Sequence, residues 1–140
     1  MIRQEVTTWD EKRWEKEYES LMEIARNHLS PAWKNGEVVV LKTTTGGIYV
    51  AEIPNYQNPE VREPLENQCI QTMAEQSDTE VLACLATVNG KHPDILSWNF
   101  RSRLIELNEN NLQTENFLWG GGESILLKSF SKLLPPNYQI

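Results

Sequence analysis

Three consecutive glycines, Gly120, Gly121 and Gly122, are the residues of this sequence whose type and spacing most suggest a binding site. They stand between an aromatic run that ends at Trp119 and an apolar run that ends at Leu134. A glycine-rich loop that enters a helix exposes backbone N–H groups to an anion, and the helix dipole assists binding. The glycines are therefore a candidate site for a small anionic ligand. A tight structural connection and a contact with a partner protein are the alternatives.

The sequence lacks the motifs that common catalytic chemistry requires. The glycines are not followed by the Gly-Lys-Ser/Thr of a Walker A loop, and no G-x-S-x-G is present. The two histidines, His28 and His92, and the two cysteines, Cys69 and Cys84, form neither C-x-x-C nor H-E-x-x-H. We expect both cysteines to be buried, reduced and inert. We therefore assign no catalytic residue, no metal ligand and no cofactor.

Composition limits the class of protein. The chain has 140 residues, of which 39% are hydrophobic and 24% charged, and it carries a formal net charge of −7. This length predicts a single domain over residues 1–140 with a real core. Negative charge argues against binding nucleic acid through a basic surface and would suit a basic partner. Since neither a membrane span nor a signal peptide is apparent, we expect a cytoplasmic protein.

The pattern of apolar residues predicts helices and strands in alternation. Pro64 would break a helix begun at Pro59, so we expect the second helix to begin at Pro64. Val81 to Val88 is a continuous apolar run, which is typical of an interior strand. The expected elements are a helix over 8–30 with a capping box at Thr8, a hairpin of strands 38–41 and 48–53, a helix over 64–76, a strand over 81–88, a helix from Ser97, and a strand over 117–119.

The residues after the glycines are predicted to form a last helix. Their apolar positions recur at helical spacing and fail to alternate; they are Leu126, Leu127, Phe130, Leu133 and Leu134. We therefore expect a helix over 123–134, with Leu127 and Phe130 buried. On this interpretation the three glycines join a strand to a helix and are not a hairpin turn.

The resulting order is α-β-β-α-β-α-β-α, which indicates an α/β fold, or alternatively α+β, with a mixed sheet in one layered domain. This order resembles that of zinc-dependent nucleoside and nucleobase deaminases. Their chemistry needs H-x-E at the start of the second helix and P-C-x-x-C at the start of the third. Here those places read NPEVREPLENQ and HPDILSWNF. The resemblance therefore implies a deaminase-like topology without the activity.

Five tryptophans suggest a surface for recognition. Trp98 and Trp119 stand at ends of predicted elements, where loops gather, and Asp94 lies in one of those loops. Tryptophan is enriched among interface hot spots, so we predict a partner interface at Asp94, Trp98 and Trp119, with packing at the margin of the core as the alternative.

These observations lead to a functional hypothesis. We expect a non-enzymatic module that binds another protein, of the immunity or antitoxin type that inhibits a basic enzyme. The alternatives are a binder of, or enzyme for, a small anionic metabolite at Gly120 to Gly122, and a homo-oligomeric structural subunit.

Overall fold

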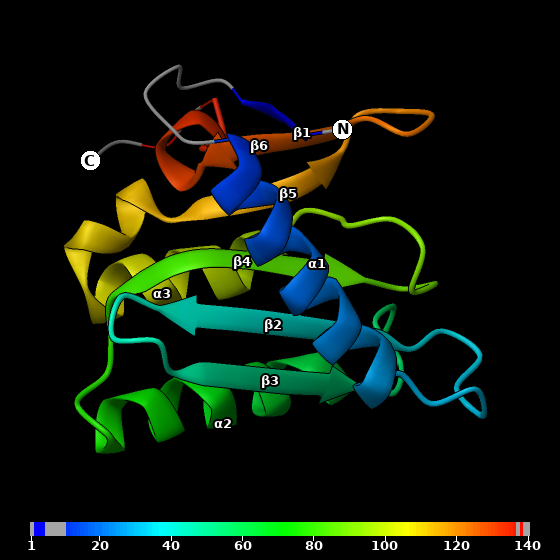
Figure 1. Ribbon diagram of the computed structural model, residues 1–140. Helices are drawn as coiled ribbons and strands as arrows, with labels where there is room; N and C mark the ends of the chain where they lie inside the picture. The colour runs from blue at the N-terminus through cyan, green and yellow to red at the C-terminus, as the bar shows by residue number, and fades with distance from the viewer. Residues whose placement is uncertain (1, 5–10, 137, 139–140) are drawn as a thin grey trace.

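The computed structural model describes residues 2–4, 11–136 and 138 (Figure 1). The elements are β1 (Ile2–Gln4), α1 (Glu11–His28), β2 (Glu37–Thr43), β3 (Ile48–Ile53), α2 (Pro59–Glu75), β4 (Val81–Thr87), α3 (Trp98–Leu107), the 3-10 helix η1 (Glu109–Gln113), β5 (Glu115–Trp119), β6 (Ile125–Ser129) and the 3-10 helix η2 (Phe130–Lys132). The strands form one sheet in the order β1-β6-β5-β4-β2-β3. The pairs β1/β6 and β4/β5 are parallel and the others antiparallel, so the predicted mixed α/β fold is confirmed.

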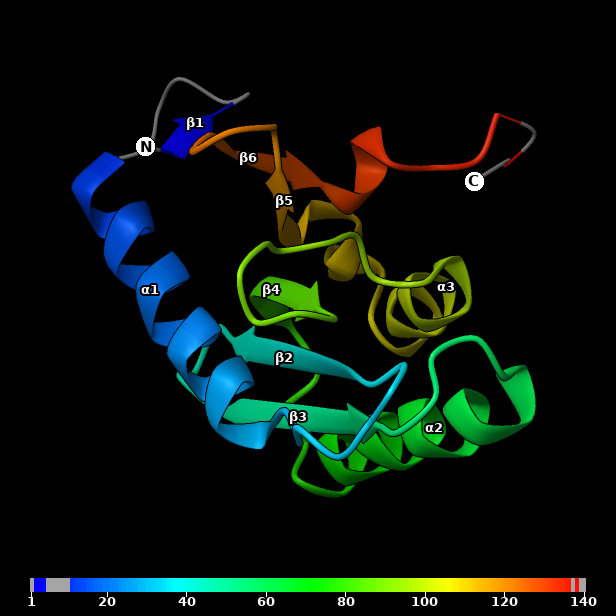
Figure 2. The ribbon, with the colours of Figure 1, turned by 90° about the vertical axis from the view of Figure 1, so that its right-hand side faces the viewer.

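Helices cover both faces of the sheet. Figure 2 shows α1 on one side and α2 with α3 on the other. The α1 side chains Trp14, Leu21 and Ala25 have no exposed surface and pack on the sheet, as their helical spacing predicts. In the described part of the chain, no helix is long and apolar enough to cross a membrane. The capping box predicted at Thr8 lies outside the described residues.

The interior strand predicted at Val81 is confirmed. β4 pairs with β2 on one side and with β5 on the other, and its side chains enter the core on both faces. The predicted hairpin is also confirmed as β2 and β3. The chain then crosses from β3 to β4 through α2 and from β4 to β5 through α3. Both crossovers lie on one face, so the starts of α2 and α3 come close together (Figure 2).

The second helix begins earlier than predicted. It starts at Pro59, and the side chain of Asn58 caps it by accepting from the backbone N–H of Glu60 at 3.0 Å. Pro64 lies inside this helix, where it removes the donor for the carbonyl of Glu60. Glu60 is exposed, so water can satisfy that carbonyl. The helix therefore tolerates a proline that the sequence rule treats as a break.

The helix predicted over 123–134 is wrong, because the structure has strand β6 and the short η2 there. The glycines form the hairpin turn between β5 and β6. The N–H of Gly120 donates to the carbonyl of Ser124 at 2.8 Å, and Gly121 and Gly122 have φ angles of 93° and 56°. Residues 125–129 form a strand despite the helical spacing of the leucines, because they pair with β5 and β1. Leu127 and Phe130 are nevertheless buried, as predicted.

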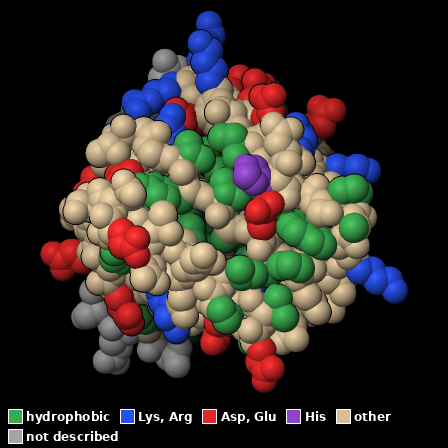
Figure 3. Space-filling model, turned by 90° about the horizontal axis from the view of Figure 1, so that it is seen from below, with side chains coloured by type: hydrophobic (Ala, Val, Ile, Leu, Met, Phe, Trp, Pro, Cys, Tyr) green, Lys and Arg blue, Asp and Glu red, His purple; other side chains and the backbone are tan. Residues whose placement is uncertain are grey.

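The two edges of the sheet complete the architecture. Strand β1, which the sequence analysis missed, pairs in parallel with β6 at one edge. Strand β3 forms the other edge, and Ile48 on it is 41% exposed. Figure 3 views the molecule from below, the β3 side in Figure 1, and shows hydrophobic side chains exposed between acidic ones.

Removing the Phe130 ring should destabilise the fold strongly. Phe130 has no exposed surface and packs in the core under α2 and α3. We expect Phe130→Ala to lower the free energy of unfolding by about 3–5 kcal/mol, because the site is fully buried. Urea denaturation measures the change, with the exposed Ile48→Thr as a control expected within about 0.5 kcal/mol. Equal losses in the two variants would contradict this assignment of the core.

Candidate functional site

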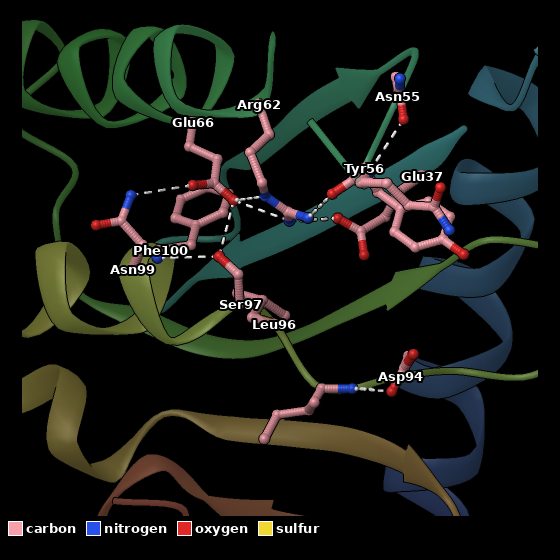
Figure 4. A network of polar contacts seen from close by, with 12 residues as sticks. Glu37, Asn55, Tyr56, Arg62, Glu66, Asp94, Leu96, Ser97, Asn99 and Phe100 are labelled. Carbon is pink, nitrogen blue, oxygen red and sulfur yellow. Dashed lines mark hydrogen bonds and ion pairs between the residues drawn. The ribbon is translucent and has the colours of Figure 1, made fainter. Parts of the chain in front are cut away.

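The starts of α2 and α3 are joined by a buried network of charged and polar side chains (Figure 4). Arg62 on α2 is its centre. Its guanidinium donates to Oε2 of Glu66 at 3.0 and 3.1 Å and to Oε1 of Glu37 at 2.7 Å. Its remaining nitrogen donates to the backbone carbonyl of Tyr56 at 2.9 Å. The network therefore ties β2 and the segment before α2 to the first turns of α2.

Glu66 carries the network across to α3. Ser97, which precedes α3, donates from Oγ to Oε2 of Glu66 at 2.9 Å, and Asn99 donates to Oε1 at 3.5 Å. The same Ser97 oxygen accepts from the backbone N–H of Phe100 at 3.1 Å and so caps α3, as predicted. One hydroxyl thus orders a helix start and fixes a buried carboxylate.

Burial makes the charges in this network interdependent. The side chain of Glu66 has no exposed surface, and those of Glu37 and Arg62 are 7% and 14% exposed. Burial raises the pKa of Glu37, although Arg62 acts in the opposite direction. Burial would lower the pKa of Arg62, but the carboxylates of Glu37 and Glu66 outweigh it and raise that pKa. The guanidinium is therefore the fixed cation that keeps two acidic side chains inside the protein.

These residues do not fit a zinc ion. Deaminase chemistry needs His or Cys ligands at the starts of the second and third helices. The corresponding turns here hold Arg62, a cation, and the hydroxyl of Ser97, whose hydrogen bond is already made. No group of three His, Cys, Asp or Glu side chains placed to hold a metal ion occurs among the described residues. Cys69 and Cys84 are buried free thiols, and burial raises the pKa of Cys69 to about 12.

The structure brings some of the predicted site residues together but not all. Asp94 and Trp119 line one groove of about 450 Å³, between the segment after β4 and strands β5 and β6. Trp98 does not line it. Its ring packs against Tyr138, with centroids 5.1 Å apart, and under the guanidinium of Arg101. The glycines form the β5–β6 turn, where the carbonyl of Gly122 accepts from the Trp119 indole N–H at 2.9 Å.

The groove has an apolar floor and an aromatic wall. Its floor consists of Leu118, Leu126 and Leu133, each partly exposed. The wall is the Trp119 indole, 47% exposed, on which the ring of His92 stacks at a centroid distance of 4.0 Å and an angle of 14°. Its remaining lining residues are Val88, Asn89, Pro93, Asp94, Ile95 and Lys128.

Hydrogen bonds to the sheet hold the loop that carries Asp94. The backbone of Asp94 exchanges hydrogen bonds with Ala86 on β4 at 2.7 and 3.3 Å. The side chain of Asn116 on β5 accepts from the N–H of Leu96 at 3.2 Å and donates to the carbonyl of Asp94 at 3.3 Å. The backbone N–H of Trp119 donates to the carbonyl of Pro93 at 3.1 Å. The backbone of the loop that lines the groove is therefore held against β4 and β5.

Sequence reasoning missed the buried network. The four-residue spacing of Arg62 and Glu66 could have indicated an ion pair on a helix face. Nothing in the sequence pointed to Glu37 as the third charge, because it is separated from Arg62 by the hairpin. The groove floor was missed because Leu126 was assigned to a helix.

Comparison with known proteins identifies the fold. No protein-family model matches the sequence, and no curated protein matches it. Among solved structures, cytidine deaminase from Burkholderia pseudomallei matches with a TM-score of 0.63 and 16% identity, covering 86% of this chain and 98% of that one. Cytidine deaminase from Bacillus anthracis matches with a TM-score of 0.62 and 16% identity, covering 86% of this chain and 88% of that one. Cytidine deaminase from Mycobacterium leprae matches with a TM-score of 0.61 and 14% identity, covering 87% of this chain and 97% of that one.

The chain has the cytidine deaminase fold. This confirms the deaminase-like topology expected from the element order. It overturns the hypothesis of a non-enzymatic protein-binding module of immunity or antitoxin type, together with its alternatives, because the matching structures are cytidine deaminases. The anionic-ligand alternative also loses its physical basis, since the glycines are followed by strand β6 and not by the predicted helix. The predicted interface at Asp94, Trp98 and Trp119 stays a prediction.

Removing the central cation should destabilise the protein. Arg62→Met leaves the carboxylates of Glu37 and Glu66 buried without their partner. We expect the free energy of unfolding to fall by about 3–5 kcal/mol at neutral pH, measured by urea denaturation. The loss should shrink as the pH falls and Glu37, whose pKa burial raises, takes up a proton. Arg13→Met, at an exposed position of α1, is the matched control.

A combined variant separates charge from packing. The combination Glu37→Gln, Arg62→Met and Glu66→Gln removes all three charges and should recover much of the stability lost in Arg62→Met. A combination no more stable than Arg62→Met would show that the guanidinium matters for its packing and not for charge neutralisation.

The protein should bind no stoichiometric zinc. Elemental analysis of the protein, purified without chelators and dialysed against a zinc buffer, is expected to give much less than one zinc per chain. One tightly held zinc per chain would contradict the assignment of the helix starts to the Arg62 network.

Proposed function

We propose that this protein binds a pyrimidine nucleoside of the cytidine type without deaminating it. The matching structures are described as cytidine deaminases, which makes a cytidine-like ligand the first class to consider. The observation that carries the proposal is the groove, which joins an aromatic wall, an apolar floor and a carboxylate. The proposal departs from those neighbours in its chemistry, because the helix starts hold an ion-paired network that supplies neither zinc ligands nor a free general base.

The groove suits the two faces of a base. A pyrimidine ring is flat and has weakly polar faces, and bases stack readily on aromatic side chains. The His92 ring covers one face of the Trp119 indole. The His92–Trp119 pair and the leucine floor thus offer apolar surfaces on two sides of the groove. A ring inserted there would cover leucine surface that is now partly exposed.

The Asp94 carboxylate suits the edge of cytosine. Cytosine presents an exocyclic amino group, a donor that carboxylates accept from. Uracil has a carbonyl oxygen at that position, which a carboxylate repels. The hydrogen bond from Ile95 N–H to Oδ1 of Asp94, at 2.8 Å, leaves the second carboxylate oxygen available. Asp94 would therefore favour cytidine over uridine.

The cytoplasmic location expected from the sequence forms part of this proposal, since nucleosides are cytoplasmic metabolites. A partner protein at the same rim is not needed for it.

Binding can be tested with cytidine itself. We expect calorimetric titration to show cytidine binding, and Trp119→Ala to weaken it roughly 5- to 150-fold, which corresponds to about 1–3 kcal/mol of stacking. Asp94→Asn should remove the preference for cytidine over uridine. Trp98→Ala is the matched control, because Trp98 does not line the groove.

Three outcomes would contradict the proposal. They are the absence of cytidine binding to the wild type at millimolar concentration, equal binding by the wild type and a folded Trp119→Ala variant, and production of uridine during the titration. Thermal melting of each variant establishes that it is folded.

A further inference from the structure

A second hollow lies at the amino ends of β4 and β5, apart from the cytidine groove. It has a volume of about 440 Å³ and is lined by Thr44, Glu80, Val81, Leu82, Asn110, Gln113 and Glu115. Val81 and Leu82 supply apolar wall, while Glu80 and Glu115 supply two carboxylates. It shares no lining residue with the groove at Trp119. Whatever it binds is therefore separate from the nucleoside proposed above.

Glu115 is the unusual group in this hollow. It is the first residue of β5, held between Ala83 of β4 and Ser129 of β6, and it is only 5% exposed. Its Oε2 atom is buried, and no hydrogen bond from the described residues reaches it. A buried carboxylate oxygen without a donor is costly, and proteins usually satisfy such groups. The structure thus contains an acceptor for which the described residues offer no donor.

Burial is the main influence on the charge of Glu115. Burial raises the pKa of Glu115 to about 6, and Lys132 on η2 acts in the opposite direction. The neighbouring Cys84 on β4 is a neutral thiol, because burial raises its pKa well above the usual value. Glu80 accepts a hydrogen bond from Asn110 at 2.8 Å and adds a second negative charge at the rim. A ligand that brings positive charge and N–H donors would satisfy both carboxylates.

We propose that this hollow binds a small alkyl diamine, with one ammonium donating to Glu115 and the other directed to Glu80. The methylene chain would lie against Val81 and Leu82, which takes apolar surface out of water. An ammonium has three donors and no acceptor, so it complements a carboxylate that has no donor. A hydrogen bond to a charged group is stronger than a neutral one, which favours an ammonium over a hydroxyl ligand.

The probe is 1,4-diaminobutane, and its binding is measured by isothermal titration calorimetry. The uncharged control is 1,4-butanediol. We expect the diamine to bind and the diol to bind at least about tenfold more weakly. Glu115→Gln should weaken diamine binding roughly 10- to 150-fold, because the amide carries no charge. Glu80→Gln should weaken it less. Glu109→Gln, exposed on the neighbouring η1, is the matched control and should bind as the wild type does.

The pH dependence gives a second readout. Alkyl ammonium groups stay protonated below about pH 9, whereas the carboxylate of Glu115 gains a proton as the pH falls through about 6. Diamine binding should therefore weaken on going from about pH 7.5 to about pH 5, and Glu115→Gln should remove most of that change.

The proposal is overturned if the diamine fails to bind the wild type at millimolar concentration, or if diol and diamine bind equally. It is overturned as well if a folded Glu115→Gln variant binds the diamine as tightly as the wild type does. Cytidine binding in the Glu115→Gln variant should be unchanged, which keeps this test independent of the proposed function.

Discussion

A carboxylate with no exposed surface, Glu66, has to be neutralised inside the protein, and the guanidinium of Arg62 does so. Two charges taken out of water are tolerated only when their hydrogen bonds are satisfied. Arg62 meets this condition through Glu66, Glu37 and the carbonyl of Tyr56, and Glu66 meets it through Arg62, Ser97 and Asn99. The network therefore fixes β2, α2 and α3 relative to one another.

The same constraint decides what chemistry the fold can perform. In deaminases the starts of the second and third helices supply ligands to a zinc ion and a glutamate that moves protons. Here a side-chain cation and a capping serine hold those turns, and their donors and acceptors are used among themselves. The groove at Trp119 shares none of its lining residues with the network. This separation is why we propose binding without deamination.

Much of the fold could be predicted from the sequence because its signals were local. The apolar run from Val81 gave an interior strand, and Ser97 gave a helix start. The helix predicted after the glycines was wrong because the spacing of apolar residues does not show which strands are available for pairing. Ile125 to Ser129 complete a hairpin with β5 and also pair with β1. The predicted start of the second helix at Pro64 was wrong because the cost of a proline inside a helix depends on whether the carbonyl that loses its donor can reach water.

The site was predictable only in part, for the same reason. Asp94 and Trp119 were grouped as a predicted partner interface because they lie at ends of elements where loops gather. The structure places both along one groove, and the interface itself stays a prediction. Trp98 was grouped with them by its position at a helix start, but its ring turns toward Arg101 and Tyr138. The charges of Glu37, Arg62 and Glu66 come from three places that only the tertiary structure brings together.

Nuclear magnetic resonance of the 15N-labelled protein during a cytidine titration tests the central claim most directly. It observes the Trp119 indole N–H and the Arg62 Nε–H in one spectrum, and so reports on the groove and on the buried network together. We predict that the Trp119 signal shifts with cytidine concentration while the Arg62 signal stays in place. An Arg62 signal that moves while the Trp119 signal does not would show that the nucleoside enters between the helix starts, and would contradict this account.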